Sequence, residues 1–219
     1  MKDGNVLGLL TEIGAILNDS HIVYTSGRHG AAYINKDALY PHTQVTSQLC
    51  LEIARHFAAA QVDVVLAPAI GGVILSQWVA YHLTQLTQRE VLGVYAEKSP
   101  DHQSFLIQRG YDLLCQSKRI LVVEDIITTG GSIRKVIAAA RAIPSEVIGV
   151  AALCNRGGIT AQEIGNVSEL FVLADLPLES WEQQDCPLCK KNIPINTSVG
   201  KQISTSSLRK FGQNEALLI

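Results

Sequence analysis

The sequence predicts an α/β fold in which helices cover both faces of a parallel sheet. Apolar runs rich in β-branched residues, such as 120–123, have the composition of strands buried on both faces. Segments with apolar residues at helical spacing separate these runs, so helices and strands alternate along the chain. Two of the strands run into turns of small residues, which is typical of ligand sites at the carboxyl ends of parallel strands.

The first part of the chain has a different pattern. One amphipathic helix is expected there, because apolar residues recur at helical spacing. These residues are Val6, Leu10, Ile13 and Leu17. Asp3 and Glu12 lie among them and a basic start is missing, so we expect a folded helix and not a signal peptide. Two short strands at 21–25 and 32–35, with a basic turn at 26–30 between them, are expected to form a small hood.

From residue 43 the helical and strand patterns alternate. Strands are expected at 62–67, 91–97, 120–123, 146–153 and 169–174, and helices at 43–59, 72–88, from the loop after the third strand to about 143, and at 160–164. A hairpin of 104–108 and 111–114, joined at Arg109 and Gly110, is also expected. The tail is expected to be extended, with a short helix near 206–211. This organisation predicts a helix and hood at 1–42, a core at 43–175 and a tail at 176–219 that packs on the core or hood.

Length and composition limit the classes of protein. With 219 residues, of which 47% are hydrophobic, the chain can form one α/β domain with a modest appendage. The net charge of -2 argues against a large nucleic-acid surface. The sequence lacks an uncharged apolar stretch of about 18 residues, so we expect no membrane span. Five cysteines, an odd number, favour reduced thiols in a cytoplasmic protein.

Cys186 and Cys189 form a Cys-x-x-Cys pair, a spacing found at metal and redox sites. One such pair supplies two ligands, whereas a closed zinc site takes about four. The sequence therefore favours a structural pair without metal in the monomer, and it leaves zinc binding open.

The most informative segment is 119–132, in which a buried strand leads into two acids and then a loop that opens a helix. Backbone N–H groups of Thr128–Ser132, at the positive end of a helix dipole, suit a phosphate monoester. Glu124 and Asp125 precede this loop, and adjacent carboxylates beside an anion site are costly unless they meet hydroxyls or a cation. Ribose hydroxyls and Mg²⁺ are the expected partners. The alternative is an ordinary turn that caps a helix, with two solvated acids.

This segment resembles the phosphoribosyl-diphosphate motif of the type I phosphoribosyltransferases: four apolar residues, two acids, two apolar residues and a Thr-Thr-Gly-Gly-Ser loop. The resemblance implies that the loop binds the 5-phosphate of 5-phosphoribosyl 1-diphosphate (PRPP) and that the acids hold the ribose hydroxyls. It also implies Mg²⁺ bound through the substrate, with no firm protein ligand. The residues expected to bind PRPP are Glu124, Asp125, Ile126, Ile127, Thr128, Thr129, Gly130, Gly131, Ser132 and Lys98.

A second turn of small residues, Ala69, Ile70, Gly71 and Gly72, follows the strand at 62–67. It resembles the pyrophosphate-binding loop of the family, although such a turn can also merely cap a helix. Some orotate phosphoribosyltransferases carry a Lys in this loop. This sequence has none there, so backbone donors would carry more of the binding.

The polar segment 98–103 is expected to form a mobile loop. On composition alone, Lys98 and His102 would be solvated side chains. In the orotate phosphoribosyltransferase family a flexible loop at this place supplies Lys and His residues to the departing pyrophosphate, often across a dimer interface. The resemblance therefore implies catalytic roles for Lys98, His102 and Asp125, and a homodimer. The loop here is shorter and poorer in basic residues than the fullest family version.

Three features resemble the orotate-specific members of the family. They are the hood segment at 24–35, the middle section at 96–111 and the Asn155-Arg156-Gly157-Gly158 turn, which resembles an Asp-Arg-x-Gly-Gly pattern. A planar guanidinium suits a carboxylate, so Arg156 is expected to bind the orotate carboxylate and Thr128 to help orient the base. Asn155 replaces the usual Asp, and Arg156 could instead turn outward.

The resemblance implies an enzyme that makes orotidine 5-phosphate and pyrophosphate from orotate and PRPP. Transfer to another base, a purine or a pyridine, is the first alternative, because recognition of PRPP is shared. The second is a regulator of the same fold that senses PRPP and binds nucleic acid, which the net charge disfavours. The third is a catalytically weak paralogue, in view of the loop poor in basic residues.

Overall fold

The computed structural model describes residues 3–24, 27–176 and 178–198. Contacts divide the chain into two units. The first contains 3–15 and 36–176, and the second contains 16–24, 27–35 and 178–198. The helix expected near 206–211 lies outside the described residues. Among the residues described, no helix is both long and apolar enough to cross a membrane.

The first unit contains a six-stranded sheet with the strand order β10-β9-β8-β5-β6-β7. Its strands are β5 (Val64–Pro68), β6 (Leu92–Lys98), β7 (Phe105–Leu106), β8 (Arg119–Ile127), β9 (Glu146–Asn155) and β10 (Leu170–Asp175). All neighbouring pairs are parallel except β6 and β7. The sheet is thus mostly parallel, and β5 and β8, which lead into the two small-residue turns, are neighbours in it.

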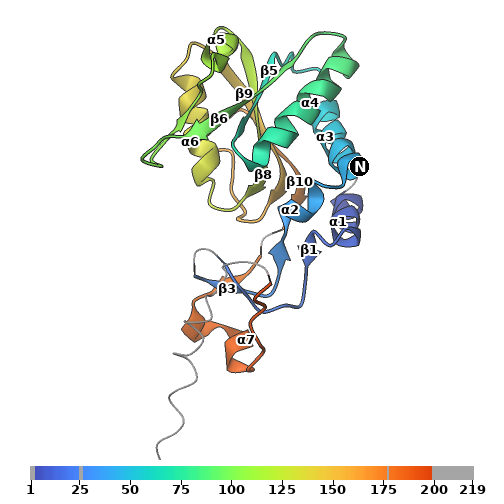
Figure 1. Cartoon of the computed structure of the whole chain (residues 1–219), viewed down its shortest axis with the longest axis vertical. Helices are drawn as coiled ribbons and strands as arrows, with labels where there is room; N and C mark the ends of the chain where they lie inside the picture. Colours follow the sequence, from blue (N-terminus) through green and yellow to red (C-terminus); the bar gives the residue numbers. More distant parts are fainter. Residues whose placement is uncertain (1–2, 25–26, 177, 199–219) are drawn as a thin grey trace, which may run out of the picture. The chain divides into compact units, whose positions relative to one another are not determined.

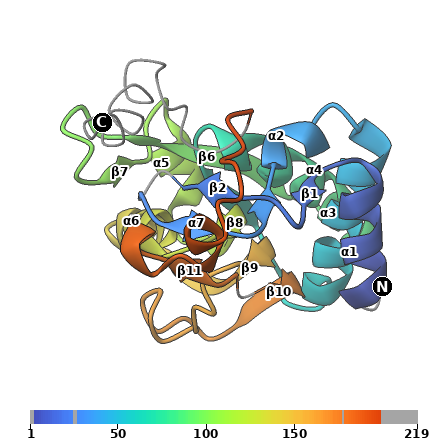
Figure 2. The ribbon, with the colours of Figure 1, turned by 90° about the horizontal axis from the view of Figure 1, so that it is seen from below.

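Helices cover both faces of this sheet. They are α1 (Asp3–Glu12), α2 (Lys36–Leu39), α3 (Thr43–Phe57), α4 (Gly71–Thr87), α5 (Tyr111–Cys115) and α6 (Gly131–Arg141). The views show α3 and α4 on one side of the sheet and α6 on the other (Figures 1 and 2). Apolar residues of α6 at helical spacing, such as Ile133 and Ile137, pack with alternate residues of β5 and β8 in one buried cluster. The alternation expected from the sequence is confirmed.

The predicted hairpin at 104–114 is wrong. Phe105–Leu106 pairs with β6, and 111–115 forms α5. Arg109 and Gly110 have positive φ values of 62° and 79°, and this turn starts the helix. Tyr111 and Cys115, four residues apart, pack against the core cluster, so the apolar spacing of this segment is helical.

Two further expectations need correction. Residues 161–165 form a hydrogen-bonded turn in place of the helix expected at 160–164. Both the amide and the hydroxyl of Thr160 donate to the Glu163 carboxylate, at 2.9 and 2.8 Å. These two hydrogen bonds join residue 160 to residue 163 and hold the segment as a single turn. His29–Gly30, expected in a turn, is strand β3, because it pairs on both sides within the second unit.

The second unit is built from very short elements. They are β1 (Ile16–Leu17), β2 (Ile22–Val23), β3 (His29–Gly30), β4 (Tyr33–Ile34), β11 (Ser180–Trp181), the 3₁₀ helix η1 (Gln183–Asp185) and α7 (Pro187–Lys190). One sheet has the order β11-β3-β2, and β1 pairs with β4. Arg28 strengthens the link to the C-terminal segment, since its guanidinium binds Glu182 at 2.6 Å and donates to the Ser180 hydroxyl at 2.9 Å.

Candidate active site

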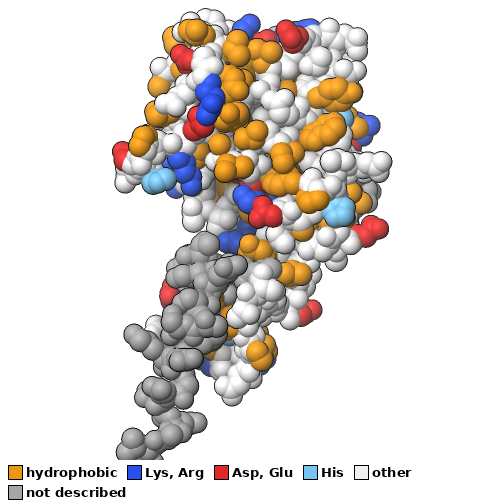
Figure 3. All heavy atoms as spheres, in the orientation of Figure 1, with side chains coloured by type: hydrophobic (Ala, Val, Ile, Leu, Met, Phe, Trp, Pro, Cys, Tyr) orange, Lys and Arg blue, Asp and Glu red, His pale blue; other side chains and the backbone are white. Residues whose placement is uncertain are grey.

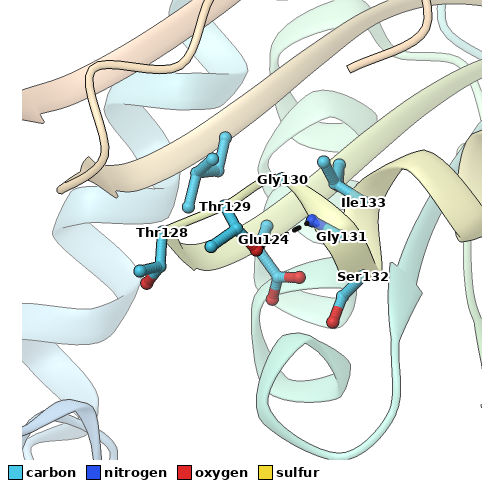
Figure 4. A pocket seen from close by; sticks show the side chains of 8 residues that line it. Glu124, Thr128, Thr129, Gly130, Gly131, Ser132 and Ile133 are labelled. Carbon is cyan, nitrogen blue, oxygen red and sulfur yellow. Dashed lines mark hydrogen bonds between the residues drawn. The ribbon is translucent and has the colours of Figure 1, made fainter. Parts of the chain in front are cut away.

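A small pocket lies at the carboxyl end of β8, where the strand passes through a tight loop into α6. It has a volume of about 90 Å³ and is formed by Glu124 and residues 127–133. The Glu124 carboxylate and the Ser132 hydroxyl point to the same side of the loop, and the Gly131 amide donates to the Thr129 hydroxyl (Figure 4). The loop therefore combines hydroxyls and helix N-terminal amides with a carboxylate, a set that fits a phosphorylated sugar.

Two glycines allow this loop to adopt its shape. Gly130 has φ +69°, and a Cβ there would lie 2.8 Å from the Ile164 side chain. A Cβ on Gly157 would overlap the Thr128 carbonyl. The turn after β9 thus packs directly against the start of the pocket loop, and the amide of Arg156 donates to the Ile127 carbonyl at 2.8 Å.

Asp125 is paired with two side chains that no sequence pattern singles out. Its Oδ2 lies 2.8 Å from Lys36 Nζ and 3.0 Å from the Tyr40 hydroxyl, which is also 2.6 Å from the Gly71 carbonyl oxygen. Burial and then the charge of Asp125 raise the pKa of Tyr40 far above its ordinary value, so the phenol stays protonated as a donor. Burial lowers the pKa of Lys36, but its hydrogen bond and charge attraction to Asp125 outweigh this, and the net shift is upward.

Glu124 has a different environment although it is the adjacent residue. Its side chain is almost completely buried, and Oε1 accepts a hydrogen bond from the Asp125 amide at 3.1 Å. Burial, and then the charge of Asp125, raise the pKa of Glu124 to about 8. Glu124 therefore keeps its proton near neutral pH until a cation or hydrogen-bond donors enter the pocket.

The second small-residue turn lies at the same edge of the sheet, because β5 and β8 are parallel neighbours. A Cβ on Gly71 would overlap Asp125 Oδ2 and come within 2.7 Å of Lys36 Nζ. A Cβ on Gly72 would lie 2.7 Å from that of Ala67. The start of α4 consequently packs tightly against the acidic end of β8. This packing brings the turn at 69–72 close to the loop at 128–132.

The family model of the phosphoribosyl transferase domain matches residues 37–183 of this chain. The chain belongs to the phosphoribosyltransferase family. Orotate phosphoribosyltransferase from Caldicellulosiruptor bescii is 34% identical over 198 residues, covering 89% of this chain and 96% of that relative. The crystal structure of orotate phosphoribosyltransferase from Aeropyrum pernix matches with a TM-score of 0.59 and 26% identity, covering 78% of this chain and 93% of that one.

The orotate phosphoribosyltransferase of Mycobacterium tuberculosis H37Rv, in complex with PRPP, matches with a TM-score of 0.59 and 19% identity. The match covers 80% of this chain and 96% of that one, and at this identity it shows a shared fold. The expected type I phosphoribosyltransferase fold, with a mostly parallel sheet and helices on both faces, is confirmed.

Lys98 and His102, the residues expected to act on pyrophosphate, lie outside the lining of the pocket. Lys98 ends β6 and is exposed, and it pairs with Phe105 of β7. His102 is exposed on the connection between these strands, where Ser99 and Asp101 form a compact turn through hydrogen bonds to the amides of Ser104 and Gln103, both of 3.0 Å.

Arg156, the residue expected to bind the base, is half-buried in the turn that follows β9. Asn155 organises this turn, because its Nδ2 donates to the Ile159 carbonyl and its Oδ1 accepts from the Ile159 amide, both at 3.0 Å. An Asp at this position would lack the donor. The departure from the family pattern at Asn155 therefore has a structural use in this chain.

The donor set of the pocket fits a hard divalent cation held through a substrate. A buried Glu124 carboxyl with a raised pKa lies beside hydroxyls, and oxygen ligands of this kind suit Mg²⁺. Asp125 Oδ2 is already engaged by Lys36 and Tyr40, so Glu124 is the carboxylate more available to a cation or to ribose hydroxyls.

Proposed function

We propose that this chain is an orotate phosphoribosyltransferase that converts orotate and PRPP to orotidine 5-phosphate and pyrophosphate. The observation that carries the proposal is the pocket at the end of β8, in which the buried Glu124 carboxyl lies beside the hydroxyls and amides at the start of α6. The relative at 34% identity over 89% of the chain bears the name of this enzyme and supports the choice of orotate.

The donor half of the reaction is assigned to the two small-residue turns. The loop at 128–132 would bind the 5-phosphate through backbone amides and hydroxyls, and Glu124 and Asp125 would hold the ribose hydroxyls. The turn at 69–72 would bind the pyrophosphate. Glu124 and the hydroxyls of the pocket would lie beside Mg²⁺ held through the substrate, and the ion would supply positive charge to the departing pyrophosphate. Lys36 and Tyr40 keep the Asp125 carboxylate fixed beside this site.

Catalysis would depend on positioning and electrostatics. The bond from ribose C1 to the pyrophosphate breaks as a ring nitrogen of orotate forms the new bond, and positive charge develops on the ribose. The proton that this nitrogen loses leaves with the pyrophosphate. Lys98 and His102 are assigned the role of stabilising the negative charge that develops on the departing pyrophosphate. Asp125 helps to fix the ribose in the reacting geometry, and no covalent nucleophile is required.

The base half of the reaction is assigned to Arg156 and Thr128. A guanidinium can bind the orotate carboxylate through two parallel hydrogen bonds. Arg156 follows β9, and its amide is tied to the carbonyl of Ile127, next to Thr128. Orotate would thus contact the loop at 128–132 near Thr128, and the 5-phosphate of PRPP would bind to the amides of the same loop.

A homodimer in the cytoplasm is part of the same proposal. The segment 98–103 resembles a loop that often serves the partner subunit in the orotate enzymes, and the cysteines are consistent with a reducing compartment. A nucleic-acid partner is disfavoured, because the net charge is -2 and acidic and basic side chains intermingle on the face seen in Figure 3.

A panel of bases tests the choice of orotate. Pyrophosphate release would be followed with PRPP, Mg²⁺ and either orotate, uracil, adenine or a pyridine carboxylate. Orotate is expected to be the preferred base, and Arg156→Lys is expected to lower kcat/KM for orotate by about tenfold or more, since a lysine loses the bidentate geometry. Preference for a different base would refute the choice of orotate while leaving the donor site intact.

A further inference from the structure

Four potential metal ligands of the second unit converge on one point. They are His21, His29, Cys186 and Cys189, and their ligand atoms all lie within 4.8 Å of one another. His21 directly precedes β2, and His29 begins β3. Cys186 directly precedes α7, and Cys189 lies within it. His21, His29 and Cys186 are buried and Cys189 is half-buried. The cluster belongs to the second unit, whereas the phosphoribosyl pocket belongs to the first.

We propose that these four side chains bind a structural Zn²⁺ ion. Two imidazole nitrogens and two thiolates form one of the usual ligand sets of closed, tetrahedral zinc sites, in which the ligand atoms lie about 3.3–3.8 Å apart. Here Cys186 Sγ and Cys189 Sγ lie 3.7 and 3.6 Å from His21 Nε2, and Cys189 Sγ lies 3.4 Å from His29 Nδ1. The two nitrogens are 2.8 Å apart and would separate slightly around an ion.

The orientation of His21 supports its role as a ligand. Its Nδ1 lies 2.6 Å from the carbonyl oxygen of Ile193. A carbonyl can only accept, so Nδ1 carries the hydrogen and Nε2 of the neutral ring presents its lone pair to the cluster. A backbone carbonyl that holds the outer nitrogen of a histidine is the usual second contact of a metal-binding imidazole.

A metal-free cluster satisfies these groups less well. Without an ion, His29 Nδ1–H would donate to His21 Nε2, which accounts for the 2.8 Å contact. The two thiols, however, approach the same His21 nitrogen, and its single lone pair cannot accept from three donors. Zn²⁺ would bind all four atoms at once, with both cysteines as thiolates.

The architecture of the second unit indicates what the ion would do. The unit joins segments that are more than a hundred residues apart in the chain, and its strands have two residues each. A unit this small buries little apolar surface, and such units usually depend on metals or disulfides. The proposed zinc would fasten the C-terminal segment at 186–189 to the strands at 21–30. With four protein ligands the site is closed, so its role is structural.

The sequence alone favoured a metal-free pair, because Cys186 and Cys189 offer only two ligands. The fold adds His21 and His29, which come from a distant part of the chain. The zinc proposal is independent of the proposed catalytic function, since it concerns different residues and its test does not measure activity.

Metal analysis of the full chain, purified in a reducing buffer without chelator, tests the proposal. Wild type is expected to contain about one zinc ion per chain, either as isolated or after addition of Zn²⁺. The double variant Cys186→Ser and Cys189→Ser is expected to lose zinc by at least about tenfold. Cys115→Ala, which removes a buried cysteine of the first unit, is the matched control and should keep its zinc.

Substitution of wild type with Co²⁺ gives a second readout that does not depend on whether a variant folds. Intense visible bands with thiolate-to-cobalt charge transfer are expected for a tetrahedral site with two sulfur ligands. Failure of wild type to take up stoichiometric Zn²⁺ or Co²⁺, a weak octahedral Co²⁺ spectrum, or a Cys186–Cys189 disulfide under reducing conditions would overturn the proposal.

Discussion

At the scale of single residues, the two adjacent acids of the pocket are held in different ways. Asp125 is paired with Lys36 and the Tyr40 hydroxyl, at 2.8 and 3.0 Å. Glu124 is buried beside this charge, and burial and the charge of Asp125 raise its pKa to about 8. One acid is therefore a fixed carboxylate, whereas the other is a carboxyl that ionises when a ligand compensates its charge.

Binding of the donor should accordingly release a proton from Glu124. Near pH 7, below its pKa of about 8, Glu124 is mostly protonated, and contact with Mg²⁺ or ribose hydroxyls favours its ionised form. Affinity for PRPP with Mg²⁺ should rise with pH up to about 8 and then level off. Calorimetric titration with PRPP and Mg²⁺, in two buffers of different ionisation enthalpy, would give the number of protons released on binding. Wild type and Glu124→Gln would be compared.

Wild type should release up to about one proton more than the Gln variant. Equal proton release would contradict the assigned state of Glu124. The raised pKa also sets the direction of the effect on stability. Between the ordinary glutamate pKa of 4.5 and the raised pKa of about 8, the folded chain holds a proton that the unfolded chain has lost. The contribution of Glu124 to the free energy of unfolding therefore falls as pH rises through that window.

Removal of the cation beside Asp125 should destabilise the first unit. Lys36→Met leaves the carboxylate, whose side chain is only 5% exposed, without its ion pair. Because Lys36 itself is 40% exposed, we expect a loss of about 1–2 kcal/mol in the free energy of unfolding, less than for a fully buried pair. Urea unfolding of wild type, Lys36→Met, Asp125→Asn and the double variant would give the coupling energy.

The pair formed by Arg89 and Asp63 at 2.8 Å is the matched control, since both of its side chains are more exposed, at 47% and 25%. Arg89→Met should cost less than about 1 kcal/mol. An equal or larger loss for Arg89→Met would show that the Lys36 pair has no special role in stability.

At the scale of elements, the β8–α6 loop is shaped by the turn that follows β9. The amides of Arg156 and Gly157 both donate to the Ile127 carbonyl, at 2.8 and 3.3 Å. Gly157 contacts the Thr128 carbonyl so closely that no Cβ fits between them. A change in the turn after β9 must therefore move the start of the phosphate loop.

Gly157→Ala should consequently weaken donor binding. We expect the Kd for PRPP to rise by about tenfold or more, equivalent to about 1.4 kcal/mol, because the added Cβ displaces backbone at Thr128. Gly8→Ala in α1 is the control, since open space surrounds that position and alanine favours a helix. Calorimetric titration of both variants would decide, and unchanged affinity in Gly157→Ala would exclude this coupling between the turns.

The elements that the sequence predicted well are those with long periodic patterns. The helices α3, α4 and α6 and the buried strands β5 and β9 fall close to their expected ranges. Strand β8 was expected at 120–123, but it continues through the two acids to Ile127. The segment 111–114 was predicted as a strand, although the positive φ values at Arg109 and Gly110 start a helix there. Two-residue strands such as β1 and β11 are too short to give any periodicity.

Within the site, the pocket loop and the acids were recognisable because they are consecutive in the sequence. Lys36 and Tyr40 were not, since a lysine and a tyrosine before a helix are common and only the fold brings them to Asp125. The roles expected for Lys98, His102 and Arg156 stay predictions, which activity measurements on their variants can test.

At the scale of the whole molecule, the chain leaves the second unit at residue 35 and returns to it at 178. The pairing of β11 with β3, the bonds of Arg28 and the cluster of His21, His29, Cys186 and Cys189 all join its two segments. The sequence showed only the Cys-x-x-Cys half of that cluster, because the histidines are brought to it by strand pairing.

Removal of zinc should therefore loosen the second unit selectively. In full-length protein treated with a chelator, we expect hydrogen exchange to accelerate by about tenfold or more at 16–24, 27–35 and 178–198, while the sheet of the first unit keeps its protection. Exchange measured by mass spectrometry, with zinc restored as the control, would show this. Unchanged exchange in the second unit after complete metal removal would contradict a structural role for the ion.

The proposed activity is tested by the consumption of orotate in the presence of PRPP and Mg²⁺, followed by the ultraviolet absorbance of orotate. Wild type should consume orotate and release an equal amount of pyrophosphate, and Asp125→Asn should lower kcat/KM by about a hundredfold, since it disturbs the acid held by Lys36 and Tyr40. If wild type binds PRPP but leaves orotate untouched, orotate is not the base that this chain uses. Full activity in Asp125→Asn would contradict the role assigned to Asp125 in the pocket.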